Sequence, residues 1–289
     1  MIAELVLDCQ NQHGEGIFWN PSDGCIWWTD IEGLSIWSYN PSTAQSTQLP
    51  MDDRVCCFAP RQSGGLIIGF ADRLSLFDLA TREEQFIRRF EPGNDATRVN
   101  DGSTDRQGRF IVGGMNEVDG SANSSVYRVD ADLSVTEIIH GVACANSTCF
   151  SPDGKTMFFA DTPDNEIVAY EYDCDSGTVS NRRVHCSFSE EPGLPDGSCV
   201  DAEGGVWNAE WEGRRVVRVN TDGVIDQVIE VPVWKPTCCA FGGAELDTLF
   251  ITTSRFLSDE KSIANEPLSG GLFAVKPGVA GVLDTPFCG

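Results

Sequence analysis

The chain has 289 residues, of which 41% are hydrophobic, and carries a net charge of −24 from 44 acidic and 20 basic side chains. This length and composition can bury a substantial core, whereas the acidic balance disfavours nucleic acid and anionic membrane as partners. No run of about 18 apolar residues occurs, and residues 1–10 lack the features of a signal peptide. We therefore expect a soluble cytoplasmic protein that is neither exported nor bound to a membrane.

The twelve cysteines include no C-x-x-C motif and no cluster with the three histidines, which argues against a zinc-finger type of site. Cys56 and Cys57 are adjacent in the sequence, as are Cys238 and Cys239, and Cys149 and Cys199 each lie beside apolar residues. We interpret them as small buried side chains in a reducing compartment rather than as reactive thiols.

A β-hairpin pattern recurs along the chain, and its clearest copy starts at Asn146. There an amide side chain opens a short apolar strand, a Ser-Pro-Asp-Gly turn follows at residues 151–154, and a second strand follows the turn. In chain order, six copies begin at a polar residue five positions before a turn: Glu15, Arg54, Asn100, Asn146, Asp196 and Lys235. A further strand pair in each copy begins at residues 36–39, 74–77, 126–129, 167–170, 216–219 and 272–275.

The copies start 39, 46, 46, 50 and 39 residues apart, so each holds about four short strands, which is the size of a propeller blade. The sequence therefore predicts an all-β fold, a six-bladed β-propeller with four-stranded blades, over residues 1–289 as one domain. No long helix is indicated, and a two-sheet sandwich does not explain the period. Residues 3–7 precede the first copy, and we expect this N-terminal strand to close the ring by joining the last blade.

The first residues of the copies would form a ring at one mouth of the central channel, because innermost strands run along it. Glu15, Asn100, Asn146 and Asp196 offer two carboxylates and two amides, a set that suits Ca²⁺, Mg²⁺ or Mn²⁺. Buried carboxylates need a partner or a cation. The alternative is that Asn and Asp simply favour positions before turns, around a channel mouth filled with water.

The loops between the second and third strands should lie at the same mouth. The longest are residues 116–124 and 254–269, which suggests a partial lid. Arg98 and Glu117 are then candidates to hydrogen-bond a polyol, with a surface salt bridge as the alternative for Glu117. Arg54 and Lys235, if they face the channel, could offset the carboxylate charge or help to bind an acidic product.

Four motifs carry a resemblance over nearly the whole chain: His13-Gly-Glu15-Gly-Ile-Phe-Trp, Arg98-Val-Asn100-Asp-Gly, Asn146-Ser-Thr-Cys-Phe-Ser-Pro-Asp-Gly and Leu194-Pro-Asp196-Gly. In this order they resemble the motifs of the regucalcin, gluconolactonase and luciferin-regenerating enzyme family. The resemblance implies a six-bladed propeller that binds one catalytic divalent metal and hydrolyses sugar lactones. Residues 113–117 and 235–239 look more like the bacterial sugar-acid lactonases than the animal calcium-homeostasis members.

Carried over by position, the resemblance implies that Glu15, Asn146 and Asp196 are metal ligands. It implies that Arg98 and Asn100 contact the sugar, with Asn100 near the metal as well. The family also uses an acidic residue in the loop after the second strand of the third blade. Glu117 is the match, although this loop differs from the family in length and sequence.

We therefore expect a metal-dependent hydrolase that opens an aldonolactone, such as arabinono-, xylono-, galactono- or gluconolactone, to the sugar acid in carbohydrate catabolism. The metal would polarise the lactone carbonyl and acidify a bound water, and Asp196 would serve as ligand and general base. Ca²⁺ is the expected ion, with Zn²⁺, Mn²⁺, Mg²⁺ and Fe²⁺ left open. The alternatives are a propeller esterase or phosphotriesterase, or a non-catalytic calcium-binding protein.

Overall fold

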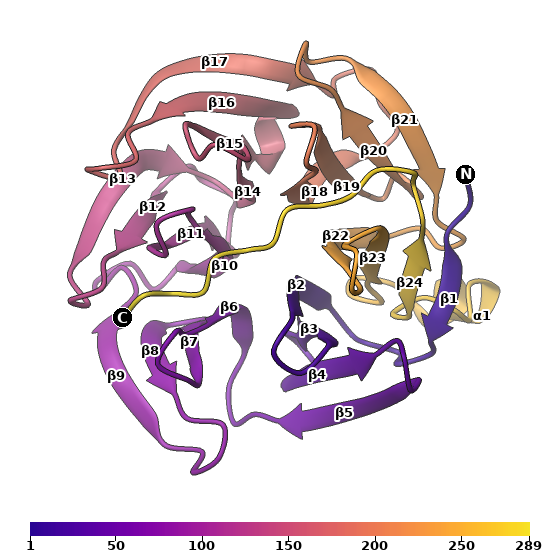
Figure 1. The fold of residues 1–289 in the computed structure, drawn as a ribbon, viewed down its shortest axis with the longest axis horizontal. Coiled ribbons are helices and arrows are strands. Elements are labelled where there is room, and N and C mark those ends of the chain that lie inside the picture. Colours follow the sequence, from indigo (N-terminus) through magenta and orange to yellow (C-terminus); the bar gives the residue numbers. More distant parts are fainter.

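Six antiparallel sheets of four strands each stand around a central axis in the computed structural model, which describes residues 1–289 (Figure 1). This arrangement confirms the six-bladed β-propeller and the four-stranded blades that the sequence repeats predict. In five blades the strand nearest the axis comes first in the chain, and the following strands lie progressively farther out, whereas the outermost strand of the sixth blade is the N-terminal β1.

The first blade contains β2 (Gly14–Asn20), β3 (Cys25–Asp30), β4 (Ser35–Asn40) and β5 (Gln45–Pro50). The second contains β6 (Val55–Pro60), β7 (Leu66–Phe70), β8 (Arg73–Phe77) and β9 (Glu84–Arg89). The third contains β10 (Thr97–Thr104), β11 (Phe110–Asn116), β12 (Ser124–Val129) and β13 (Val135–Val142). The fourth blade contains β14 (Ala145–Phe150), β15 (Thr156–Asp161), β16 (Glu166–Tyr172) and β17 (Val179–Ser187). The fifth contains β18 (Leu194–Val200), β19 (Val206–Trp211), β20 (Arg215–Val219) and β21 (Ile225–Glu230). The sixth contains β22 (Pro236–Gly242), β23 (Thr248–Thr253) and β24 (Leu272–Val275), joined by β1 (Glu4–Leu7). The helices are the 3₁₀ turn η1 (Thr162–Asp164) and the short α1 (Glu260–Asn265). Neither has the length and apolar character that crossing a membrane requires.

Strand β1 closes the ring as the sequence predicts. It pairs antiparallel with β24, with Glu4 opposite Ala274 and Leu5 opposite Phe273. The sixth blade is therefore built from both ends of the chain, and its outer strand cannot separate without opening the ring. This arrangement also leaves β24 without a free edge.

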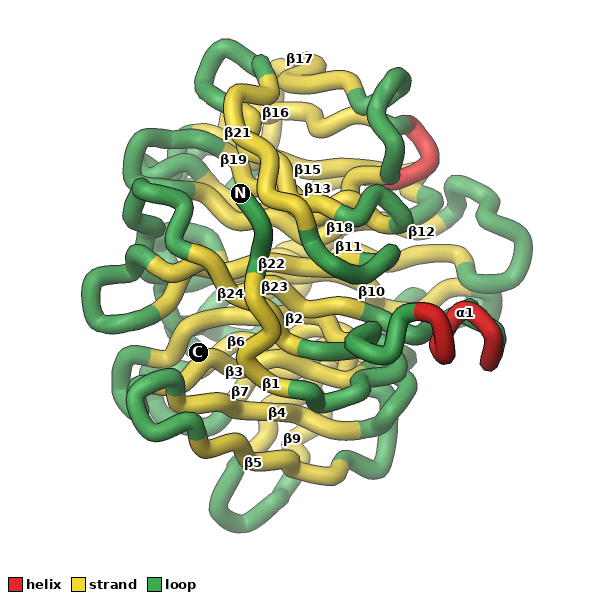
Figure 2. The backbone as a smooth tube through the Cα atoms, turned by 90° about the vertical axis from the view of Figure 1, so that its right-hand side faces the viewer, coloured by secondary structure: helices red, strands yellow, loops and turns green.

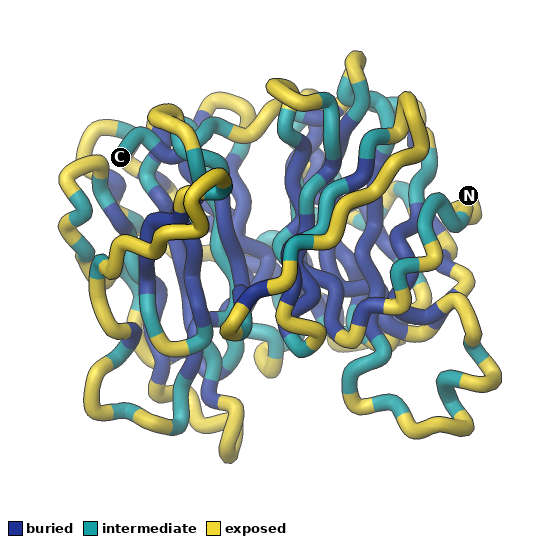
Figure 3. Tube along the Cα trace, turned by 90° about the horizontal axis from the view of Figure 1, so that it is seen from below, coloured by how far each residue is buried: buried dark blue, intermediate teal, exposed yellow.

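The core lies between neighbouring blades. Six clusters of buried apolar side chains each combine residues of two adjacent sheets, and Trp28 and Trp207 within them are fully buried. Figure 3 shows the strands near the axis as buried and the loops at both ends as exposed. Because this packing has the face-to-face character of stacked sheets, each inner strand is held from both sides.

Every inner strand contains a bulge, at which it has one more residue between two paired positions than the second strand beside it. In the first blade Glu15 lies opposite Thr29, whereas Phe18 lies opposite Trp27. The same shift by one residue occurs in the other five inner strands. Such bulges bend a strand and re-aim its side chains, so the ring repeats one distortion of the backbone at the level of the channel where we expect the site.

The C-terminal residues 276–289 cross the near opening of the ring in Figure 1. They lie on the side of the ring opposite α1, as Figure 2 shows. The backbone of Gly281 donates to the carbonyl of Leu246 in the sixth blade at 2.8 Å, and that of Phe287 donates to Pro60 in the second at 2.8 Å. This C-terminal strap, which no local sequence pattern predicts, spans the ring across one end of the channel.

The strap is expected to contribute to stability mainly through Phe287, which is fully buried against the core between the second and third blades. Replacing Phe287 by Ala should lower the free energy of unfolding by about 3–5 kcal/mol, the usual cost of emptying a buried aromatic site. Urea unfolding followed by tryptophan fluorescence measures it. Leu283→Ala, at a strap position that is 43% exposed, is the control and should change stability by less than about 1 kcal/mol; equal effects of the two variants would contradict the prediction.

Candidate active site

A cavity of about 330 Å³ is lined in part by Phe256 and Leu257, from the segment that carries α1. Because the C-terminal strap lies on the side opposite α1 (Figure 2), this cavity is at the other end of the channel. Five of the six site residues predicted from the sequence line it: Glu15, Arg98, Asn100, Asn146 and Asp196. They come from the inner strands of the first, third, fourth and fifth blades. The structure therefore brings together side chains that stand up to 181 residues apart in the sequence.

Two buried carboxylates, those of Glu15 and Asp196, face this cavity. Burial, followed by repulsion from Asp101, raises the pKa of Glu15 to about 8. Burial, followed by the charge of Glu15, raises the pKa of Asp196 well above its ordinary value. Neither shift is offset by a salt bridge to lysine or arginine. Like charges buried together need a cation, so this pair of side chains favours a positive ion between them.

Asn146 is held so that its amide oxygen is available beside these carboxylates. Its Nδ2 donates to Thr162 Oγ1 at 2.8 Å, and that hydroxyl donates to the carbonyl of Pro195 at 2.9 Å. Its Oδ1 is 3.3 Å from Asn100 Nδ2, which also donates to the carbonyl of Ala145 at 2.9 Å. The hydrogen bonds therefore fix the orientation of the Asn146 amide. Two carboxylates and one amide oxygen form a hard donor set, which fits a divalent ion such as Ca²⁺.

Arg98 is the only basic side chain that lines the cavity, and Glu117 lies behind it. Arg98 is 5% exposed; its Nε donates to Glu117 Oε2 at 2.9 Å and its Nη1 to Asn100 Oδ1 at 2.9 Å. Glu117 also accepts two hydrogen bonds from Arg54, at 2.9 and 3.0 Å. Arg54 is the main cause that lowers the pKa of Glu117. The carboxylate of Glu117 is not part of the cavity wall and instead orients Arg98.

Lys235 holds the lid of the cavity. Its side chain is 1% exposed, its Nζ donates to the carbonyl of Phe256 at 2.7 Å, and it lies 4.9 Å from the ring centroids of Trp211 and Trp234. Phe256 and Leu257 belong to the segment between β23 and β24 that carries α1, and both line the cavity. The long loop predicted as a partial lid is thus anchored by Lys235, while Arg54 is engaged by Glu117.

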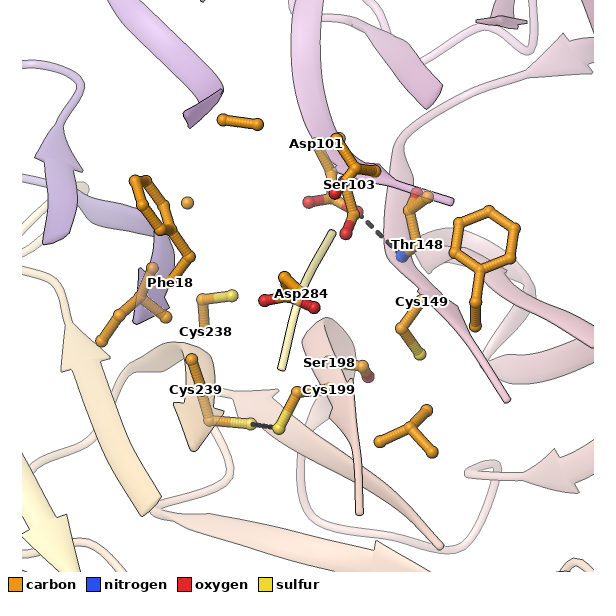
Figure 4. Close-up of a pocket in the computed structure, with 18 of the residues that line it drawn as sticks. Phe18, Asp101, Ser103, Thr148, Cys149, Ser198, Cys199, Cys238, Cys239 and Asp284 are labelled. Atoms are coloured by element: carbon orange, nitrogen blue, oxygen red, sulfur yellow. Dashed lines mark hydrogen bonds between the residues drawn. The ribbon is translucent and has the colours of Figure 1, made fainter. Parts of the chain in front are cut away.

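Two further residues near the axis, His13 and Asp101, are not among the site residues predicted from the sequence. Asp101 follows Asn100 within the bulge of β10; its Oδ2 accepts from the Thr148 backbone at 2.9 Å, and burial raises its pKa. Figure 4 shows Asp101 and Asp284 of the strap in a second, smaller cavity of about 60 Å³ at the strap end of the channel. In a regular strand, neighbouring side chains point to opposite sides, so only one of Asn100 and Asp101 would face the axis. The bulge in β10 allows both side chains to face it. Its position directly after a predicted site residue is the one signal that could have identified Asp101.

The chain is similar to known proteins over almost its whole length. The family described as SMP-30/Gluconolactonase/LRE-like region matches residues 13–255. L-arabinolactonase of Azospirillum brasilense is 36% identical over 291 residues, covering 99% of this chain and 96% of the relative. Pentonolactonase XacC of Haloferax volcanii is 33% identical over 254 residues, covering 88% and 86%. The crystal structure of the calcium-binding protein regucalcin from Agrobacterium tumefaciens superposes with a TM-score of 0.94 at 28% identity, covering 99% and 97%.

The Lys235 anchor generates a prediction about the lid. Lys235→Met keeps a long apolar stem between the tryptophan rings but removes the donor to Phe256. Because a hydrogen bond from a charged group contributes about 1.5–3 kcal/mol, amide exchange in residues 254–271 should accelerate by about tenfold or more. Hydrogen-exchange mass spectrometry of peptides from this segment measures it. Lys276→Met, which removes a surface ion pair with Asp247, is the control, and unchanged lid exchange in Lys235→Met would refute the anchor.

Proposed function

The chain belongs to the SMP-30/gluconolactonase/LRE-like family, and we propose that it opens a pentono- or hexonolactone to the sugar acid with one divalent metal ion. Relatives named for arabinonolactone and pentonolactone support the substrate class. The structural relative described as a calcium-binding protein supports Ca²⁺ as the ion. The observation that carries the proposal is the buried pair Glu15 and Asp196 beside the amide of Asn146, without a protein cation between them.

The metal ion, when bound by Glu15, Asn146 and Asp196, supplies a Lewis acid that polarises the lactone carbonyl and makes an attacking water more acidic. These three residues come from three different blades, whose inner strands are packed rigidly against their neighbours. The ligand geometry is therefore set by the ring before any ion arrives, which reduces the ordering that binding requires.

Asp196 is also the proposed general base. Its main chain is fixed because its carbonyl accepts from Ser147 Oγ at 2.6 Å and from Asn208 Nδ2 at 3.0 Å. A Cβ atom at Gly197 would lie 2.3 Å from Cys238 Sγ, so only glycine permits this close packing of the fifth and sixth blades. No side chain donates a hydrogen bond to the Asp196 carboxylate. One of its oxygens can therefore hold the ion while the other takes the proton of the attacking water.

Arg98 and Asn100 are proposed to bind the substrate. Arg98 uses Nε and Nη1 for bonds within the protein, whereas its Nη2 has no protein partner and remains free for a sugar oxygen. Glu117 fixes the guanidinium plane, so we assign it a positioning role through Arg98. Holding the guanidinium in place beforehand favours a reactive arrangement of the bound lactone.

The proposed function predicts acid release from aldonolactones. Purified protein should hydrolyse at least one of arabinono-, xylono-, galactono- and gluconolactone, lose activity after the metal is stripped with chelator, and regain it with Ca²⁺ or another divalent ion. A pH-indicator assay measures this.

Asp196→Ala should lower kcat/KM by about 10²- to 10⁴-fold, the usual contribution of a general base, while Asp222→Asn on an exposed turn should have no effect. Chelator-resistant hydrolysis would remove the metal from the proposal, and faster turnover of phosphotriesters than of every lactone would favour the esterase alternative.

Asn146 is predicted to be a neutral ligand whose loss spares the fold. Asn146→Ala should weaken Ca²⁺ binding by at least the roughly tenfold that loss of a supporting partner costs, measured by isothermal titration calorimetry. Its circular dichroism spectrum without metal should match that of the wild type. Thr162→Val keeps the Asn146 side chain but removes the hydroxyl that orients its amide and that also donates to Pro195, so it should weaken binding less. Unchanged affinity in Asn146→Ala would show that this residue is not a ligand.

A further inference from the structure

We propose that His13 is a substrate-binding residue, whose Nε2 atom accepts a hydrogen bond from a hydroxyl group of the sugar lactone. This inference rests on the proposed function and extends it by a specificity-determining contact. His13 is 9% exposed, lines the cavity and immediately precedes strand β2, which carries Glu15.

The hydrogen bonds around Ser254 determine which imidazole nitrogen carries the proton. Ser254 Oγ is 2.9 Å from His13 Nδ1 and 3.0 Å from the carbonyl of Gln12. A hydroxyl has one hydrogen, and the carbonyl can only accept. If the hydroxyl hydrogen pointed at the imidazole, two oxygens would face each other at 3.0 Å with no hydrogen between them. Only a proton on Nδ1 makes both contacts hydrogen bonds, which leaves Nε2 with a free lone pair.

Nε2 is directed at the cavity. It has no partner in the protein, yet it is not among the unpaired polar atoms that the protein fully encloses, and His13 belongs to the cavity wall. The ring itself is fixed from two sides. Its centroid lies 5.7 Å from that of Trp211, edge to face, and 5.2 Å from that of Phe256. The imidazole therefore cannot turn its free nitrogen away without losing both aromatic contacts and the bond to Ser254.

An imidazole that carries its one proton on Nδ1, as the contacts of Ser254 require, can only accept a hydrogen bond at Nε2. The wall at this point therefore selects for a donor, which on a sugar lactone means a hydroxyl group.

The position of His13 separates it from the chemistry at the metal ligands. Side chains two residues apart on extended backbone point to the same side and lie about 6–7 Å apart along the strand. His13 precedes Glu15 and lies beside the lid residues Ser254 and Phe256, so it is nearer the mouth. It is placed to contact a hydroxyl group remote from the carbonyl that reacts. His13 would therefore distinguish sugar lactones by the stereochemistry of that hydroxyl group.

Two substitutions separate the two nitrogens. The amide of His13→Asn reaches about as far as Nδ1 and can keep the bond to Ser254, whereas that of His13→Gln reaches about as far as Nε2. On the preferred lactone, His13→Asn should raise KM by about three- to tenfold, as expected for one lost hydrogen bond, with little change in kcat. His13→Gln should recover part of this loss. His140→Asn, on an exposed outer strand, is the control and should match the wild type.

Monodeoxy lactones identify the contact. The wild type should discriminate against one deoxy lactone, and His13→Asn should show no further loss on that compound, because the partner hydroxyl is already missing. An equal loss on all lactones, or no loss on any, would overturn the proposal while leaving the lactonase activity of the wild type intact.

A second measurement does not depend on turnover. Nitrogen-15 NMR of the imidazole should show His13 with a proton on Nδ1 and a bare Nε2, and addition of the sugar acid should shift the Nε2 resonance. A proton on Nε2, or a resonance that does not respond to saturating sugar acid, would refute the inference. A wild type that hydrolyses no lactone would instead refute the proposed function, and the NMR result would still decide whether His13 contacts a polyhydroxy acid.

Discussion

The structure depends on one electrostatic constraint, the burial of Glu15 and Asp196 at the axis of the ring with no protein cation to neutralise them. Two unit charges about 4 Å apart repel by about 4 kcal/mol at an effective dielectric constant near 20. That is a large share of the roughly 5–15 kcal/mol by which a folded domain is stable. The raised pKa of both side chains indicates that, without a cation, the pair reduces this repulsion by holding a proton. The rigid ring keeps the two side chains together, and a cation bound between them would take the place of that proton.

Rigidity comes from the way in which the blades are joined. Each inner strand is packed on both sides by apolar clusters shared with the neighbouring blades. The ring is closed by β1 on β24 and spanned at one end by the C-terminal strap. Asp196 illustrates the result, because Ser147 from the next blade holds its carbonyl and Gly197 lets the sixth blade approach closely. Local repulsion is thus opposed by contacts spread around the whole ring.

The sequence predicted the parts of this fold that arise from local patterns. Turn residues such as Ser151-Pro-Asp-Gly154 and alternating apolar segments determine hairpins, and their regular return determines the number of blades. The apolar start of the chain, at residues 3–7, was enough to predict the closing strand. Five of the six predicted site residues line one cavity. Four of them, Glu15, Asn100, Asn146 and Asp196, occupy the corresponding position of the repeat, and Arg98 stands two residues before Asn100.

What the sequence could not predict depends on offsets of one residue and on contacts between distant segments. Asn146 pairs just before its bulge, whereas Asp196 lies within a bulge, and Lys235 precedes the first paired residue of its strand. If the repeat is taken as strictly periodic, these three residues occupy equivalent positions. Lys235 would then face the carboxylates, whereas in the structure its ammonium group binds the lid. The strap and the Arg54–Glu117 pair join blades that local patterns cannot relate.

The positions of the basic residues also explain how an anionic site can release an anionic product. Lys235 and Arg54 are both engaged away from the carboxylates, which leaves the axis free for a metal ion. Arg98 alone brings positive charge to the cavity wall, and Glu117 takes two bonds from Arg54 but only one from Arg98. In the proposed reaction negative charge develops on the carbonyl oxygen and remains on the sugar acid. A metal ion held by Glu15, Asn146 and Asp196 would supply one positive partner for that charge, and the free Nη2 of Arg98 would supply another. The surplus of acidic groups on the protein would favour departure of the product.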